Sequence, residues 1–242
     1  YMSGHSKWAT IKRKKAATDA KRGKIFTTII KEITIAAREG GGDADSNPRL
    51  RQAVSNAKSA NMPSDNITRA IKKGTGELPG VTYEEVSYEG YGPAGVAIFM
   101  ECLTDNKQRT VAEIRHLISK YGGNLSENGS VSWMFDKKGQ ITLKANEHEE
   151  DVVFEAALEA GAEDFEAADN VFIVSTDSSE IMSVRDALDS QGYEIESANI
   201  DMVPKNLHNV ESDKEQSVIT LLEALEDHDD IKAVYTNFDS VE

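Results

Sequence analysis

The chain lacks most of the features that mark secreted, membrane-bound or disulfide-stabilised proteins. Its 242 residues include one cysteine, Cys102, so no internal disulfide can form, which suits a reducing compartment. No run of about 18 apolar residues is present, so no membrane span is expected. The basic N-terminus has no apolar stretch of the kind found in signal peptides. We therefore expect a cytoplasmic protein without a membrane partner.

Signals for catalysis and cofactor binding are also missing. The segment 90–95 reads G-x-G-x-x-G, but Pro93 interrupts it, and a β-like run follows where a dinucleotide site needs a helix. Cys102 lies in an apolar strand, which favours an inert buried thiol over a nucleophile. The histidines show no metal-ligand spacing; they are His5, His116, His148, His208 and His228. The sequence predicts a protein that is not an enzyme, with no catalytic residues, no metal and no cofactor.

Charge is distributed very unevenly along the chain. Residues 1–75 hold 16 Lys and Arg against 6 Asp and Glu, whereas residues 76–242 hold 11 against 36. The overall charge of −15 would repel nucleic acid, yet the first third is as basic as a dedicated nucleic-acid-binding domain. A solvated, solubilising face is the alternative interpretation. It is disfavoured because the acidic remainder already makes the chain soluble.

The basic third therefore supplies the candidate phosphate contacts. Six such contacts would give a log–log salt slope of roughly −4 to −5, but they would carry little sequence information. The candidate nucleic-acid-binding residues are Lys7, Lys12, Arg13, Lys14, Lys15, Lys21, Arg22, Lys24, Arg49, Arg51, Lys72 and Lys73. Further cations continue this surface onto the predicted helices at Lys31, Arg38, Lys58 and Arg69.

Residues 1–77 are predicted to form the basic helical domain. Apolar residues at helical spacing indicate a helix from about Thr18 to Arg38, and the glycines at 40–42 end it. Asn47-Pro48 is typical of an N-cap followed by proline in the first turn. Pro63-Ser64 opens a third helix that Gly74 ends. Trp8 would either anchor the basic N-terminal segment to the first helix or stack on a base or sugar, and the anchor is favoured.

Beyond Gly80 the pattern changes to short strands and helices. Predicted helices cover Asn106–Tyr121, about Glu147–Ala160, Ser179–Ser190 and Glu215–Glu226. Predicted strands cover Tyr83–Tyr88, Val96–Leu103, Val131–Phe135, Gln140–Leu143, Glu163–Glu166, Val171–Ser175, Glu194–Met202 and Ala233–Phe238.

A faint internal repeat organises these elements. Thr104-Asp105, a helix and Gly122 are echoed about seventy residues later by Thr176-Asp177, a helix and Gly192. Two small α/β sandwiches, each a sheet with helices on one face, would explain this repeat. The fold class expected is α+β multidomain.

The chain resembles the YebC family of bacterial regulators, whose mitochondrial relative activates translation of a cytochrome oxidase subunit. The resemblance covers essentially the whole chain, with mild departures at Thr28, Ala94 and Gln108. The segments that carry it are 4–8, 22–24, 40–43, 47–50, 62–63, 69–71, 88–93 and 104–106.

This resemblance implies three domains around a cleft. A basic helical domain over residues 1–77 would precede two ferredoxin-like α/β sandwiches. One sandwich would be discontinuous, over residues 78–130 and 204–242, with the other, residues 131–203, inserted in it. The resemblance also implies either a DNA-binding transcriptional regulator or a translation factor that relieves stalled ribosomes.

Three functions remain open from the sequence. The leading hypothesis is a non-enzymatic, DNA-binding regulator of transcription. A translation factor that binds ribosomal RNA is the second; the long connection from Gly40 to Ser46 favours it, because a helix-turn-helix needs a tight turn. A protein-interaction adaptor, with partners on the acidic domains, is the third.

Overall fold

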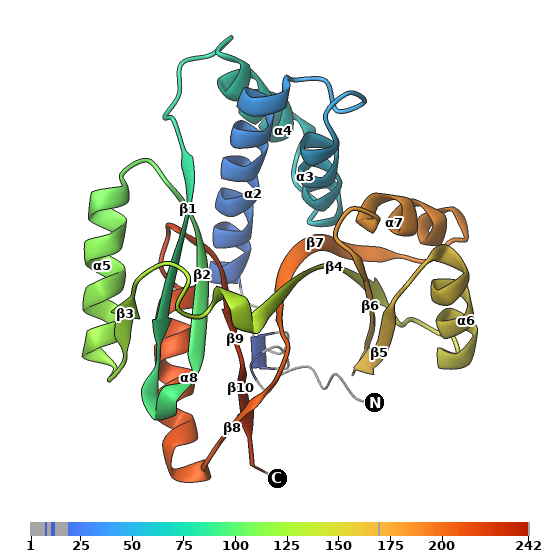
Figure 1. Cartoon of the computed structure of the whole chain (residues 1–242). Helices are drawn as coiled ribbons and strands as arrows, with labels where there is room; N and C mark the ends of the chain where they lie inside the picture. The colour runs from blue at the N-terminus through green and yellow to red at the C-terminus, as the bar shows by residue number, and fades with distance from the viewer. Residues whose placement is uncertain (1–7, 9–10, 13–18, 169, 242) are drawn as a thin grey trace. The chain divides into compact units, whose positions relative to one another are not determined.

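The computed structural model describes residues 8, 11–12, 19–168 and 170–241 (Figure 1). These residues fall into two compact units. Unit 1 contains the described residues up to Lys31 together with 81–136 and 203–241, and unit 2 contains residues 32–80 and 137–202. The α+β multidomain class predicted from the sequence is confirmed. The three-domain boundaries stay a prediction.

Unit 1 is built on a four-stranded sheet with the order β3-β1-β2-β9. Strands β1 and β2 form an antiparallel pair, in which Val86 lies opposite Cys102. The 3-10 turn Pro93–Gly95 connects them, so the G-x-G-x-x-G segment is a hairpin connection, as predicted. The strands are β1 (Glu84–Tyr91), β2 (Ala97–Thr104), β3 (Asn124–Ser126) and β9 (Ile231–Thr236).

Two helices cover one face of this sheet, α5 (Lys107–Lys120) and α8 (Ser212–Glu226) (Figure 1). Because side chains alternate along a strand, β2 turns Ile98, Met100 and Cys102 toward these helices. Trp8 is 4% exposed and belongs to the same core. It is therefore packed against the sheet and helices of unit 1 and not against the first helix, where the sequence had placed it. A parallel pair, β8 (His208–Val210) with β10 (Phe238–Ser240), completes the strands of unit 1.

The helical part of unit 2 consists of three amphipathic segments. They are the second half of α2 (Asp19–Gly40), α3 (Pro48–Ser59) and α4 (Ser64–Thr75). The Asn47 side chain accepts a hydrogen bond from the Leu50 amide at 3.1 Å, so the predicted N-cap is confirmed. The α2–α3 connection is long, as expected, but only the four residues 60–63 join α3 to α4.

The sheet of unit 2 has the order β5-β6-β4-β7. It shares a core with α6 (Glu150–Ala160) and α7 (Ile181–Ser190) (Figure 1). The repeat predicted from the sequence is thus present as two helix-backed sheets, and Thr104 and Thr176 are both fully buried where β2 and β6 end. The strands are β4 (Phe135–Lys144), β5 (Asp164–Ala168), β6 (Val171–Asp177) and β7 (Ile195–Pro204).

Helix α3 lies against the edge strand β7 through two amide side chains. Asn56 donates to the Ala198 carbonyl at 3.0 Å and accepts from the Ala198 amide at 3.1 Å. Gln52 donates to the same carbonyl at 2.9 Å. These bonds pair backbone groups at the edge of the sheet, where ladder partners are missing on one side.

One predicted strand is wrong. The segment 131–135, expected to be β-like, contains the 3-10 turn Ser132–Met134, and β4 starts only at Phe135. The backbone N–H groups of Val131 and Ser132 donate to the carboxylate of Glu89, at 2.7 Å and 2.9 Å. They are therefore not available to a sheet ladder.

Candidate nucleic-acid interface

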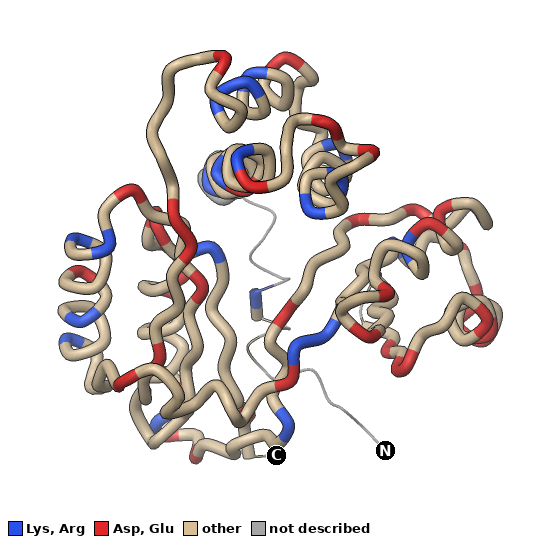
Figure 2. Tube along the Cα trace, turned by 45° about the horizontal axis from the view of Figure 1, so that its top comes forward, with Lys and Arg blue, Asp and Glu red and all other residues tan. Residues whose placement is uncertain are grey.

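Five exposed cations of unit 2 lie on its helices, and two more, Lys137 and Lys144, lie on β4. Figure 2 shows where Lys and Arg fall along the chain trace. On α4, Arg69, Lys72 and Lys73 follow helical spacing i, i+3 and i+4, so they share the face opposite the buried Ile67 and Ala70. In the part of the chain that the structure describes, none of these three has an ion-pair partner. With Arg38 on α2 and Lys58 on α3 they form a set that we call the exposed helix cations.

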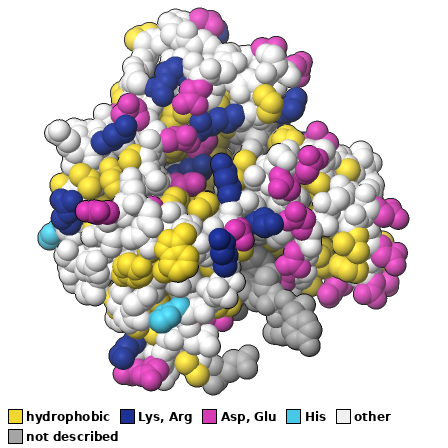
Figure 3. Space-filling model, in the orientation of Figure 1, with side chains coloured by type: hydrophobic (Ala, Val, Ile, Leu, Met, Phe, Trp, Pro, Cys, Tyr) yellow, Lys and Arg dark blue, Asp and Glu magenta, His cyan; other side chains and the backbone are white. Residues whose placement is uncertain are grey.

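The helices themselves are only weakly basic. Residues 32–75 hold 7 Lys and Arg against 5 Asp and Glu, whereas residues 1–31 hold 9 against 1. Accordingly, cations over the helices of unit 2 alternate with acids on the face shown in Figure 3. Most of the net positive charge therefore lies before residue 32, in the N-terminal segment and in the first part of α2.

The twelve candidate contact residues differ in their positions and contacts. Lys7, Arg13, Lys14 and Lys15 lie outside the described residues, and Lys21 and Arg22 lie in the first turns of α2. Arg49 pairs with Glu39 at 2.7 Å and Glu32 at 3.4 Å, which ties α3 to α2. Arg51 lies on α3 near the Asp45 carbonyl, 3.5 Å away, and Lys72 and Lys73 are exposed on α4.

Two more candidates, Lys12 and Lys24, contact the end of α8 and the loop that follows it. Lys12 Nζ lies 2.9 Å from a carboxylate oxygen of Glu226, and Lys24 Nζ donates to the His228 carbonyl at 2.9 Å. Burial lowers the pKa of Lys24, although Glu226 acts in the opposite direction. These two lysines hold the N-terminal part of the chain within unit 1. Phosphate binding by them stays a prediction.

Lys31 was expected on the basic surface, and that expectation is wrong. Its side chain is buried, and its Nζ donates to Asp230 Oδ1 at 3.2 Å, to the Asp229 carbonyl at 2.9 Å and to the Leu103 carbonyl at 3.1 Å. A lysine with three internal acceptors is not available to a phosphate. Helical periodicity alone placed it among exposed cations, although position 31 faces the strand ends of unit 1.

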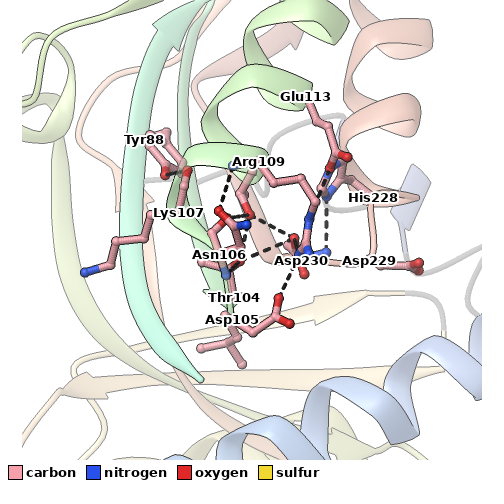
Figure 4. Close-up of polar contacts among 12 residues, drawn as sticks. Tyr88, Thr104, Asp105, Asn106, Lys107, Arg109, Glu113, His228, Asp229 and Asp230 are labelled. Atoms are coloured by element: carbon pink, nitrogen blue, oxygen red, sulfur yellow. Dashed lines mark hydrogen bonds and ion pairs between the residues drawn. The ribbon is translucent and has the colours of Figure 1, made fainter. Parts of the chain in front are cut away.

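Asp230 is the centre of a buried polar network (Figure 4). Its second oxygen, Oδ2, receives Arg109 Nη2 at 2.7 Å and Thr110 Oγ1 at 2.8 Å, with Thr104 Oγ1 at 3.4 Å. Burial raises the pKa of Asp230, but the hydrogen bonds from Arg109, Thr110 and Lys31 outweigh burial, so its pKa is lowered. The hydrogen bonds that Arg109 donates to Asp230 and to Asp105 raise the pKa of Arg109.

His228 extends this network toward solvent (Figure 4). Its Nδ1 accepts from the Asp230 amide at 3.1 Å, and its Nε2 lies 2.9 Å from Glu113 Oε2. The potential ligand atoms of Glu113, His228 and Asp230 lie within 4.8 Å of one another, which is close enough to share a metal ion. However, the two cations at the Asp230 carboxylate already neutralise it, so a metal would have to displace an ammonium or guanidinium group. The network fits a structural role better than a metal site.

Glu89 is a second buried carboxylate, and sequence reasoning gave it no role. It is 3% exposed and accepts backbone hydrogen bonds from Gly129, Val131 and Ser132 at 2.7–2.9 Å. Burial raises its pKa, but these three bonds outweigh burial and lower it. The loop that Glu89 holds presents Trp133, which is 65% exposed and which the sequence analysis also missed. The sequence does place this tryptophan close to the turn-forming residues Asn128-Gly129-Ser130, which could have indicated an exposed loop position.

The fold and the charges define a multidomain α+β protein whose basic residues are concentrated before and within its N-terminal helices. Among the described residues, no helix is long and apolar enough to span a membrane. A family model described as the TACO1/YebC protein N-terminal domain matches residues 6–77, and one described as the TACO1/YebC second and third domain matches residues 83–238. The chain belongs to the TACO1/YebC family.

Relatives of known name match along nearly their whole length. Proteins from Syntrophus aciditrophicus and Desulforapulum autotrophicum are 58% and 56% identical, each over 98% of this chain and 96% of the relative. Both are named "probable transcriptional regulatory protein". The crystal structure of the conserved hypothetical protein Aq1575 from Aquifex aeolicus is 47% identical, covers 98% of both chains and has a TM-score of 0.91.

Proposed function

We propose that this protein is a non-enzymatic regulator of gene expression that binds nucleic acid through its basic N-terminal third. The segregation of charge carries the proposal. Apart from the buried Lys31, eight cations against one acid precede residue 32, and the five exposed helix cations follow them. Phosphate neutralisation by such residues provides affinity that does not depend on sequence.

Binding to DNA in a transcriptional role is the leading form of this proposal. It is supported by the names of the relatives and by the four-residue connection between α3 and α4. Helix-turn-helix readers join their two helices by a turn of about this length and place the second helix in the major groove. The outer face of α4 offers Thr68 and Arg69 for base edges and Lys72 for phosphate.

A triple substitution on α4 tests this form. Replacing Arg69, Lys72 and Lys73 with alanine should weaken binding to a 20-base-pair duplex. It should also reduce the salt slope by about 2 to 3, because each lost phosphate contact contributes about 0.9. The control removes the same charge from α5, at the exposed Lys107, Arg115 and Lys120. Fluorescence anisotropy across a salt series measures the affinity and the salt slope of each variant. Equal losses in the two variants would show that only net charge acts and would contradict a role for α4.

Ribosomal RNA is the second candidate target. The observation that favours it is the concentration of charge before residue 32, outside the α3–α4 pair. Crosslinking in cells followed by sequencing of the bound nucleic acid separates the two targets. Enriched promoter DNA supports the transcriptional form, and enriched 23S-type RNA supports a translation factor.

A protein-interaction adaptor is a candidate of another class. Helix α6 exposes Phe154 and Leu158, at 42% and 47%, and its sequence places the exposed Asp151 and Glu155 beside them. Apolar residues among acids suit a basic protein partner better than nucleic acid. Protein partners that survive complete nuclease digestion of a pull-down, and that are lost when Phe154 is replaced by serine, support the adaptor.

A further inference from the structure

Trp133 is the most exposed large apolar side chain among the described residues, at 65%. Burying a tryptophan side chain is strongly favourable, so an indole in water is costly unless something covers it in the working state. The other tryptophan, Trp8, follows the ordinary pattern and is 4% exposed.

The loop around Trp133 is held in place by buried groups. Glu89 binds three backbone amides of residues 129–132, as described above. The Ser130 carbonyl then accepts from both Tyr91 Oη at 3.2 Å and Trp133 Nε1 at 3.0 Å. The Met134 amide donates to the Val131 carbonyl at 2.9 Å and closes the turn. The indole is therefore oriented before any partner arrives, which reduces the entropy lost on binding.

The polar edge of the indole is already used inside the protein. Because Nε1–H donates to Ser130, the exposed part of Trp133 is its flat aromatic surface. A flat aromatic surface with no unmet hydrogen bond suits a partner that stacks on it. Nucleobases are such partners, and their stacking tolerates any sequence because every base has a π face.

The surroundings of Trp133 favour a base over a protein. Protein hot spots lie at the centre of well-packed apolar patches. Here the other exposed residues of segment 127–136 are Glu127, Asn128, Gly129 and Asp136, so Trp133 is the one exposed apolar side chain of its loop. Lys205 donates its amide to the Met134 carbonyl at 2.9 Å, and its Nζ lies 3.4 Å from Asp136. This lysine offsets the nearest acid of the loop.

We propose that Trp133 is a stacking platform for an unpaired base of the bound nucleic acid. The inference rests on the proposed function, because it needs a nucleic-acid partner. It adds that this partner has at least one base free of Watson–Crick pairing: a single strand, a loop or a flipped nucleotide. Trp133 would then contribute affinity that depends on bases, whereas the cations contribute affinity that depends on phosphates.

The test compares oligomers that differ only in their bases. The full chain is titrated with a 12-nucleotide single strand as DNA, with the same sequence as RNA, and with a DNA backbone of abasic residues. Trp133→Ala should weaken binding to the base-containing strands by about fivefold or more. It should leave binding to the abasic strand unchanged, and Trp133→Phe should retain most of the affinity. Val81→Ala is the control, because Val81 is a 52% exposed apolar residue elsewhere in unit 1.

Intrinsic fluorescence gives an independent readout. Because Trp8 is buried and Trp133 is exposed, quenching by base-containing strands reports mainly on Trp133. If Trp133→Ala loses more affinity for the RNA strand than for the DNA strand, the stacked base belongs to RNA; the opposite result assigns it to DNA.

Two outcomes overturn the inference in different ways. If Trp133→Ala binds all three oligomers as the unaltered protein does, the platform is wrong although nucleic-acid binding stands. If the unaltered protein binds none of the oligomers and no duplex, the proposed function fails as well.

Discussion

Lys31 Nζ lies 3.2 Å from Asp230 Oδ1, and both side chains are less than one-tenth exposed. This buried pair joins α2 to the start of β9 within unit 1. Breaking a buried ion pair is costly because it leaves an uncompensated charge, whereas the intact pair adds little net stability. The predictions on Asp230 follow from this asymmetry.

Asp230→Ala should lower the free energy of unfolding by about 3–5 kcal/mol, because Lys31 and Arg109 lose their shared counter-ion. Urea denaturation followed by circular dichroism measures the change. Asp229→Ala removes the same charge from an exposed side chain and should stay within about 0.5 kcal/mol of the unaltered protein. Similar effects at the two positions would contradict a special role for the buried carboxylate.

The stability that Asp230 provides should depend on pH. Because its folded-state pKa is lowered, its contribution is complete above the unfolded pKa of about 3.9 and is lost as the pH falls through the folded-state pKa. The stability difference between the unaltered protein and Asp230→Asn should therefore be constant above about pH 5 and should shrink below about pH 4. A difference that remains constant in acid would count against the lowered pKa; Asp229→Asn serves as the reference.

Glu89→Gln should loosen the loop that carries Trp133. The amide keeps only one acceptor oxygen for three backbone donors, so at least one buried N–H loses its partner, at a cost of about 1–3 kcal/mol. Hydrogen exchange should accelerate at Gly129, Val131 and Ser132. Glu127→Gln, on an exposed residue of the same loop, should leave exchange unchanged. Protection that survives Glu89→Gln would mean that the loop has another support.

Cys102 should resist alkylation in the folded protein. It is 1% exposed, and burial raises its pKa to about 12, so almost no thiolate exists at pH 8. Mass spectrometry after iodoacetamide treatment should find it unmodified in buffer and modified in urea. Rapid native modification would indicate that the β2 core opens frequently.

Sequence patterns predicted the local structure well where a local cause exists. Asn47 caps α3 because its own side chain reaches the Leu50 amide, and the amphipathic stripe of α5 gives a helix over Lys107–Lys120, close to the predicted range. The Thr-Asp pairs recur in the sequence at the ends of two strands, and in the structure both threonines, Thr104 and Thr176, are buried there. Such features need only neighbouring residues.

The features that sequence missed depend on partners far along the chain. Segment 131–135 has strand-like residues, but Glu89, some forty positions earlier, takes its amides. Lys31 resembles an exposed helix cation until Asp230, 199 positions away, is placed beside it. The same holds for the candidate interface. Its cations were chosen by charge alone, and the sequence did not predict that Lys12 pairs with Glu226 or that Arg49 pairs with Glu32 and Glu39.

The amide contacts between α3 and Ala198 also bear on self-association. Strand β7 is an edge of its sheet, and an open edge is a template on which a second copy can add a strand. Asn56 occupies both backbone groups of Ala198, so a strand from another molecule would have to displace it. Growth of this sheet into intermolecular aggregates is thus discouraged at β7, and the edge strand β5 is where such addition should begin.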